Sequence, residues 1–400
     1  MTPLRAQVLE TAEELKPYEE AWDALAAQAQ RPYCAPAWML AWWREAAEEG
    51  SALRAVVVLD GEELAGIAPF YVEPRSPGLT ARYRPLASSL SARIEPLARV
   101  GWEPDVAAAV AVALAGAEPE PGVIVFENVL AASPWPQLLA RSWPALGEPW
   151  VERHTPIAAP TLAIAGLNLD DWLASKSRNF RGQMRRARRK LEKQGAVFRM
   201  SESEDELERD LIAFARLHRA RWDFRGGSAV LHEPVERMLA DAGRALLPSQ
   251  RFRLFSIELE GRTVSSQLFL AAGGELAYWL GGFDESLSSQ WPSLQGLVQA
   301  LEDGFERGED RFDLGAGAQH YKYRFADGED KLETVMVVPR GRRYALARAQ
   351  LVPGQVRREL ARRLPPGAKA RLRALLRQGD GGEAGGGGEA GDRERTGSHG

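Results

Sequence analysis

Two side chains in the last third of the sequence, Asp313 and Lys322, have types and a spacing suited to handling an amine substrate. Asp313 ends a short apolar run, and a glycine turn, Gly315-Ala316-Gly317, separates it from the pair Tyr321-Lys322. A buried carboxylate near an ammonium can position or polarise an amine, and each charge shifts the pKa of the other. We predict Asp313, Tyr321 and Lys322 as catalytic residues, with a structural ion pair between Asp313 and Lys322 as the alternative.

Other reaction centres lack their motifs in this sequence. There is no Ser-x-Gly nucleophile elbow, no Walker lysine and no His/Glu spacing for a metal, so no metal is expected. The glycine turn lacks the third glycine and the following helix of a dinucleotide fingerprint. Cys34 is the only cysteine, which excludes an internal disulfide and a cysteine-based zinc site.

The elements that would position these residues follow one another between Leu276 and Phe325. A strand over 277–283 and a polar loop precede an amphipathic helix over 292–307, which should begin near Ser293 with a serine N-cap. Gly308 should stop this helix, and 311–314 should be a brief strand that ends in a polar turn.

The run WPSLQGLVQALEDGFERGEDRFDLGAGAQHYKYRF resembles the motif core of the CelD/BcsL-like (BioF2-like) acyltransferases of the GNAT superfamily, and its ending is similar to that of the FemABX peptide ligases. The strings APAWMLAWWREA and LHRARWDFRGG also look like family motifs. The resemblance covers residues 170 to 338 best. It implies a GNAT fold, an acyl-CoA (acetyl-CoA) co-substrate and transfer to an amine or hydroxyl.

In a GNAT fold the pantetheine arm pairs with a strand edge and the phosphates sit on backbone N–H groups at a helix start. The strand Ala277 to Gly281 and the helix start Pro292 to Gly296 match these places in order and spacing. The phosphate signature is not intact, since serine and glutamine stand where glycines are usual. The residues that the resemblance assigns to the cofactor are Leu280, Gly281, Gln290, Ser293, Leu294, Gln295 and Gly296.

A second group is predicted to contact the acceptor. His218, Arg221 and Trp222 are spaced i, i+3 and i+4 on one expected helix, so they share a face that could line a pocket. A purely structural histidine is the alternative for His218. Asp284 and His320 complete the predicted acceptor-binding set.

The order hairpin, helix, strand occurs twice, first around Asp60-Gly61 and again around Glu260-Gly261-Arg262. We therefore expect an α+β protein of tandem GNAT-like domains, with mixed, mostly antiparallel sheets flanked by helices. The predicted parts are a degenerate GNAT-like domain over 1–165, a GNAT domain over 166–340, a basic helical segment over 341–378 and a disordered glycine-rich tail over 379–400.

Two segments are strongly basic although the net charge is −4. The helix expected over 175–194 has a narrow apolar stripe within arginines, which is typical of a solvated face or of a surface for an anionic ligand. Without interleaved aromatic residues, specific nucleic-acid binding is not expected. Residues 340–377 hold 12 basic residues and one acid, which suits contact with an anionic membrane or packing on the protein's own acidic parts.

The sequence has no apolar run of the roughly 20 residues that a spanning helix needs and no signal-peptide pattern at its start, so a cytoplasmic protein is expected, peripheral at the inner membrane surface if the basic segment binds lipid. The predicted function is an acyltransferase acting on a small-molecule, lipid-linked or envelope-polysaccharide acceptor. Two alternatives stay open: an aminoacyl-tRNA-dependent peptide ligase like the FemABX proteins, and a non-catalytic binding protein of envelope polysaccharide assembly.

Overall fold

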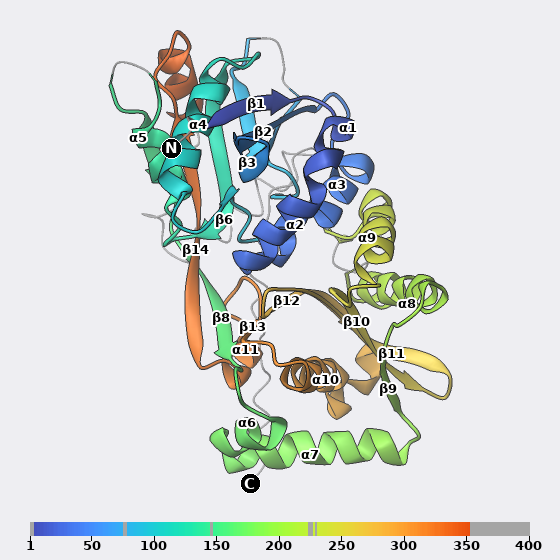
Figure 1. The fold of residues 1–400 in the computed structure, drawn as a ribbon. Coiled ribbons are helices and arrows are strands. Elements are labelled where there is room, and N and C mark those ends of the chain that lie inside the picture. Colours follow the sequence, from blue (N-terminus) through green and yellow to red (C-terminus); the bar gives the residue numbers. More distant parts are fainter. Residues whose placement is uncertain (1–3, 75–77, 145–146, 223–226, 229, 353–400) are drawn as a thin grey trace. The chain divides into compact units, whose positions relative to one another are not determined.

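The computed structural model describes residues 4–74, 78–144, 147–222, 227–228 and 230–352. Residues 1–350 form one unit, in which the described strands join one mixed sheet (Figure 1). The strand order along this sheet is β1-β2-β3-β4-β6-β14-β8-β13-β12-β11-β10-β9, with β5 beside β3 and β7 beside β14.

The first half of the chain is built on the predicted hairpin. Asp60 pairs with Glu63 across the two-residue turn Gly61-Glu62, whose first residue has a positive φ that glycine adopts without strain. The aromatic-rich helix α3 and the helix α4 each bury apolar side chains against these strands. The elements of this half are β1 (Arg5–Leu9), α1 (Ala12–Leu15), η1 (Lys16–Tyr18), α2 (Glu19–Gln28), η2 (Pro32–Cys34), α3 (Pro36–Glu45), β2 (Ala52–Asp60), β3 (Glu63–Val72), β4 (Ala81–Pro85), β5 (Leu97–Ala98), α4 (Glu103–Ala115), β6 (Pro121–Leu130), α5 (Trp135–Arg141), β7 (Trp150–Arg153) and β8 (Ile157–Ala163).

The second half repeats the hairpin with Glu260 and Gly261 as turn residues, both at positive φ. Side chains of its strands alternate between two apolar cores: Leu254 packs in the core that includes residues of α8 and α9, and Phe255 in the one that includes residues of α7 and α10. Helices therefore cover both faces. The elements are α6 (Leu169–Ser175), α7 (Arg178–Lys193), β9 (Val197–Met200), α8 (Glu204–Trp222), α9 (Glu233–Leu246), β10 (Phe252–Leu259), β11 (Arg262–Ala272), β12 (Glu275–Phe283), η4 (Glu285–Gln290), α10 (Pro292–Glu306), β13 (Arg311–Asp313), α11 (His320–Phe325) and β14 (Gly328–Val338).

Three local expectations around the predicted site are wrong. Residues 286–290 belong to the 3₁₀ helix η4 instead of a loop. The N-cap of α10 is Trp291, in the left-handed region at φ 55°, and not a serine; Ser293 lies within the first turn. The polar turn after Gly317 continues as the short helix α11, because burial of Lys322 and Phe325 holds one turn of helix against the sheet.

The last strand connects the two halves. β14 pairs antiparallel with β6 over Val337↔Ile124 to Leu332↔Leu130, and with β8 over Gly328↔Thr161 to Leu332↔Ile157. β8 in turn pairs with β13. The sheet therefore continues from one half into the other through strands exchanged in both directions.

The described start of the basic C-terminal segment packs on the sheet-bearing unit. The guanidinium of Arg348 lies 3.7 Å from the ring centroid of Trp150, and Gln350 accepts a hydrogen bond from the Thr80 hydroxyl at 2.8 Å. The rest of the predicted segment and the glycine-rich tail lie outside the described residues. Among the described helices, none is long and apolar enough to cross a membrane.

Candidate functional site

An open strand edge lies where β12 and β13 separate. β13 is parallel to β12 for three residue pairs, from Glu275↔Arg311 to Ala277↔Asp313, and then ends. β12 continues for six more residues, Tyr278–Phe283, and no described strand pairs with that stretch on the β13 side. The pairing of β12 with β11 slips at Trp279, which is the bulge that allows the strand to bend at this point. The backbone groups of Trp279–Gly282 on this edge can pair with an added extended ligand.

The start of α10 supplies two more backbone donors. Pro292 has no N–H, and the N–H of Gln295 already binds the carbonyl of Trp291 at 3.0 Å. The N–H groups of Ser293 and Leu294 have no acceptor within the described part of the chain. Helix starts carry partial positive charge, so these two amides can hold one anionic group.

Gln267, a buried residue of β11, explains two of the predicted cofactor glycines. A Cβ at Gly281 would lie 1.9 Å from Gln267 Oε1, and a Cβ at Gly296 would lie 2.8 Å from Gln267 Cγ. The amide of Gln267 therefore occupies the space that these glycines leave between β12 and α10. Its Nε2 is 3.5 Å from the Ser293 hydroxyl, so the amide reaches the first turn of α10.

The other predicted cofactor residues differ in their surroundings. Leu280 is half-buried on the open stretch of β12. Gln290 is buried directly before α10, and its Oε1 has no hydrogen-bond partner among the described residues. Gln295 points away from the strand edge, because its Nε2 donates to the carbonyl of Met184 in α7 at 3.2 Å. The side chain of Gln295 therefore fastens α10 to α7.

Asp313 and Lys322 do not form the ion pair that is the structural alternative to a catalytic role. Asp313 is paired with Arg93 from the first half, at 2.8 Å from Nε and 3.1 Å from Nη2, and it also accepts from the N–H of Gly315 at 3.0 Å. Lys322 Nζ instead donates to the carbonyls of Gly315 at 3.0 Å and Ala316 at 2.6 Å. Burial lowers the pKa of Lys322 to about 8, against a smaller opposing effect of Asp313.

Gly315 connects this lysine to the open strand edge. Its φ is +74°, and a Cβ there would lie 3.2 Å from the carbonyl oxygen of Tyr278 and 3.9 Å from Lys322 Nζ. Gly315 therefore lies between the Lys322 ammonium and the carbonyl of Tyr278, where β12 extends beyond β13. Tyr321 is half-buried against the core below α10, whereas His320 is exposed.

The predicted acceptor residues are engaged in local structure. His218 is buried on α8, where its Nε2 is 2.8 Å from the Ser228 hydroxyl. The helix α8 approaches β12 closely, since a Cβ at Gly282 would lie 2.8 Å from the backbone nitrogen of His218. The Asp284 side chain caps η4 by accepting a hydrogen bond from the N–H of Ser286 at 3.0 Å. It also accepts one from the Ser286 hydroxyl, which is the main cause of the lowered pKa of Asp284. The side chains of Arg221 and Trp222 lie outside the description.

The sequence did not predict a network of charged side chains at the point where β12 and β13 separate. Arg93 also binds Asp330, and Arg311 binds Asp330 as well as Glu275, at 3.5 Å to the latter. Burial, followed by the proximity of Asp313, raises the pKa of Glu275 to about 7. Tyr33 adds a hydrogen bond to the carbonyl of Ala277 at 3.3 Å. Nothing in the sequence marks Arg93, because it is one of 44 arginines and lies 220 residues from its partner.

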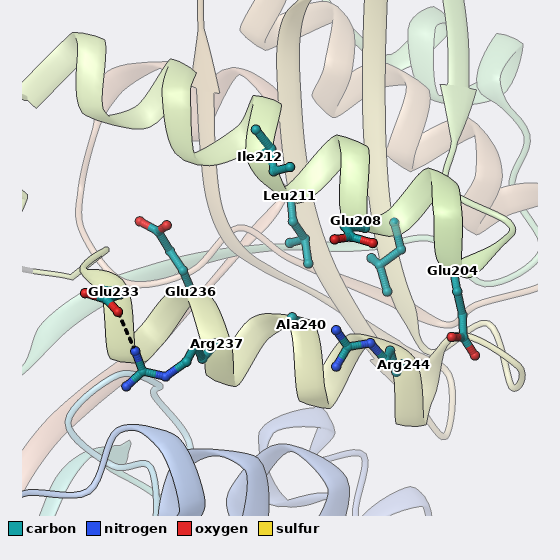
Figure 2. Close-up of a pocket in the computed structure, with 10 residues that line it drawn as sticks. Glu204, Glu208, Leu211, Ile212, Glu233, Glu236, Arg237, Ala240 and Arg244 are labelled. Atoms are coloured by element: carbon teal, nitrogen blue, oxygen red, sulfur yellow. Dashed lines mark hydrogen bonds and ion pairs between the residues drawn. The ribbon is translucent and has the colours of Figure 1, made fainter.

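A separate groove lies between α8 and α9 (Figure 2). Its volume is about 270 Å³, and Figure 2 shows Leu211 and Ala240 between the two helices and glutamates along them. No predicted catalytic, cofactor-binding or acceptor-binding residue lines it. Among the described residues no cluster of side chains could hold a metal ion.

Comparison with known proteins finds one matching family model and several similar solved structures. Residues 178–323 match the family model of the acetyltransferase (GNAT) domain. The crystal structure of FemX is similar with a TM-score of 0.58 at 14% identity, over 80% of this chain and 96% of that one. A conserved protein of unknown function from Bacteroides thetaiotaomicron VPI-5482 gives 0.53 at 10% identity, over 84% and 100%. A tandem GNAT protein from the clavulanic acid biosynthesis pathway gives 0.41 at 15% identity, over 84% and 99%.

The GNAT family model and the similarity to FemX confirm the fold prediction of an α+β protein with GNAT-like mixed sheets flanked by helices. No curated protein matches the chain by sequence.

Proposed function

We propose that this chain, which carries a GNAT-type acetyltransferase domain over residues 178–323, transfers an acyl group from a pantetheine thioester such as acetyl-CoA to an amine or hydroxyl. The observation that carries the proposal is the stretch Trp279–Gly282 of β12, which lies just beyond the end of β13 and has no described strand beside it on that side. An extended pantetheine arm has amide groups that can pair with such an edge in the manner of an added strand.

The phosphate end of the donor belongs at the start of α10. The free N–H groups of Ser293 and Leu294 point out of the helix start, where an anion is favoured. Gln267 and the adjoining glycines bring the Ser293 end of α10 next to β12, so arm and phosphate can be held at once.

The reaction needs no covalent enzyme intermediate. A neutral acceptor amine attacks the thioester carbonyl, the C–N bond forms, the C–S bond breaks, and the amine proton ends on the departing thiolate or on solvent. Lys322 uses two of its three N–H donors on the carbonyls of Gly315 and Ala316, and the third stabilises the negative charge that develops on the carbonyl oxygen. Asp313 is a positioning residue that fixes the Gly315 turn, and Tyr321 remains predicted as catalytic.

The finer assignments continue as proposals. The chain is proposed to be a CelD/BcsL-like enzyme of the cytoplasm that modifies a small-molecule, lipid-linked or envelope-polysaccharide acceptor. Residues 340–377 would attach it to anionic membrane through their 12 basic residues. Sedimentation with anionic and neutral liposomes, for the full chain and for a chain truncated at residue 340, tests that attachment; equal binding by both proteins would refute it.

The donor site is tested by calorimetric titration of the full chain with acetyl-CoA. Binding is expected in the native protein and should be lost in Ser293→Glu, because a carboxylate at the first turn of α10 repels phosphate. Ser249→Glu introduces the same charge at an exposed serine after α9 and is the control. Acetyl-CoA binding that is equal in the native protein and Ser293→Glu would refute this placement, and binding of aminoacyl-tRNA in place of any pantetheine thioester would favour the peptide-ligase alternative.

A further inference from the structure

The outer face of α7 carries a row of cations. Within this 16-residue helix, the exposed basic side chains that follow one another at alternating steps of one and three residues are called the α7 stripe. They extend over about 12 Å, at 1.5 Å per helical residue. The members of the α7 stripe are Arg185, Arg186, Arg189, Lys190 and Lys193.

The α7 stripe is not neutralised by the protein itself. Arg185 lies 3.8 Å from Asp170, in a pair whose side chains are 57% and 91% exposed. The other four members have no ion-pair partner among the described residues. Like charges four residues apart on a helix repel, so the arrangement weakens α7. The helix is held by its inner face, where Phe180, Met184 and Leu191 are buried, and this packing does not need the outer cations.

The helix that carries the α7 stripe packs beside the proposed donor site. Met184 of α7 accepts the hydrogen bond from Gln295 in the first turns of α10. Arg324 binds Gln183 of α7 at 2.7 Å and lies 4.9 Å from the ring centroid of Trp291, the N-cap of α10. α7 therefore lies beside α10, whose first turn is the proposed phosphate site (Figure 1).

The start of α10 also limits how many phosphates it can hold. Two free N–H groups, of Ser293 and Leu294, suffice for one phosphate. Free acyl-CoA brings three phosphates to this place, whereas a pantetheine arm attached to a carrier protein brings a single phosphodiester. Any further negative charge on the donor would have to be bound outside the start of α10, and the neighbouring cations are those of α7.

We propose that the α7 stripe is the docking surface for a small acidic carrier protein that presents the acyl group on a phosphopantetheine arm. The inference rests on the proposed acyl transfer and narrows its donor. Arginine suits an acidic partner, since its planar guanidinium can donate two parallel hydrogen bonds to one carboxylate. A single-stranded nucleic acid fits less well, because the ring of Phe198 beside α7 is covered by the Arg188 guanidinium at 3.6 Å and offers no stacking face.

The chemistry balances as in the proposed function. The acceptor attacks the thioester carbonyl, the bond to the pantetheine sulfur breaks, and the carrier protein leaves with a free thiol after taking up the released proton. No oxidant or further reactant is required.

The test uses the full chain and two charge-reversed variants with the same change of net charge. Arg186→Glu/Arg189→Glu alters the α7 stripe, and Arg5→Glu/Arg244→Glu alters exposed arginines on β1 and α9. Each protein is titrated with an acetylated acyl carrier protein of a bacterial fatty-acid synthase and, separately, with acetyl-CoA. We expect the stripe variant to bind the carrier at least tenfold more weakly than the native and control proteins, with the difference shrinking as salt is raised. Acetyl-CoA affinity should change less than threefold.

Each other outcome identifies what has failed. If acetyl-CoA binds and the carrier does not, or if the carrier binds both variants equally, the docking surface is refuted while the proposed function stands. If neither donor binds, both are refuted. Stripe-dependent binding of a tRNA or of anionic vesicles, without binding of the carrier, would assign the stripe to that partner instead. Unchanged melting temperatures show that the variants are folded.

Discussion

Arg93 and Asp313 meet in a two-point ion pair although 220 residues separate them, with Nε 2.8 Å and Nη2 3.1 Å from the two carboxylate oxygens. Both side chains are buried. Asp313 is the last residue of β13, so an arginine from the first half of the chain fixes the point at which β12 and β13 part. The proposed donor site in the second half thus depends on the first half.

Arg93→Leu should destabilise the protein by about 3–5 kcal/mol, because it leaves the charge of Asp313 buried without its partner. Urea unfolding measures this loss. The exposed pair of Arg44 and Asp241, at 2.6 Å, also links the two halves and serves as the control; Arg44→Leu should cost less than about 1 kcal/mol. Similar losses in the two variants would contradict the assigned role of Arg93.

Lys322→Met should lower kcat by roughly 10²–10³-fold, the usual effect of removing one donor to a developing oxyanion. Methionine keeps the unbranched shape of the side chain, so most of the packing survives, although the carbonyls of Gly315 and Ala316 lose a donor. Steady-state kinetics and thermal melting are measured together. A fall in melting temperature with native kcat per folded molecule would make the lysine purely structural.

The lowered pKa of Lys322 should make both the activity and the stability of the protein depend on pH. Its pKa is lowered to about 8, so the charged form required for turnover is lost as pH rises through that value. In the unfolded chain it keeps its proton up to about pH 10.4, so between these values the unfolded state binds more protons and stability rises with pH. Activity and stability should therefore change in opposite directions. In Lys322→Arg the limb of the kcat profile near pH 8 should disappear.

The raised pKa of Glu275 should make the stability of the protein depend on pH with the opposite sign. Its pKa is raised from 4.5 to about 7, mainly by burial, so between these values the folded protein holds a proton that the unfolded chain has released. Stability should fall as pH rises through this window. Glu275→Gln stays neutral, so its melting temperature should fall less between pH 5 and about 7. Parallel melting curves of the two proteins across this range would contradict the buried, protonated carboxyl.

Gly281→Ala should cost about 1–3 kcal/mol, because the new methyl group would overlap Gln267 Oε1. A double-mutant cycle with Gln267→Ala isolates this contact, and the glycine substitution should be less harmful in that background. Gly182→Ala is the control, since the nearest atom there is the mobile end of Arg186 at 3.3 Å. Equal costs of Gly281→Ala in both backgrounds would show that Gln267 is not what requires the glycine.

What could be predicted from the sequence was local. The turn at Glu260-Gly261 and the helix α10 follow from turn residues and apolar spacing within a few positions. The N-cap at Trp291 could not be predicted, since its left-handed backbone is imposed by η4 ending against α10. The partner of Asp313 could not be predicted either, because only the completed sheet brings Arg93 to β13. The predicted domain boundary at 165/166 remains a prediction.

β14 has a consequence for synthesis on the ribosome. β6 is complete at Leu130, but the strand that covers its second edge begins at Gly328. At 5–20 residues per second, about 10–40 s pass before that strand emerges. During this time the apolar run Val123–Phe126 has an uncovered edge of the kind that aggregates. The nascent first half therefore waits for the last part of the chain, and its yield in the cell should depend on chaperones that hold unfinished strands.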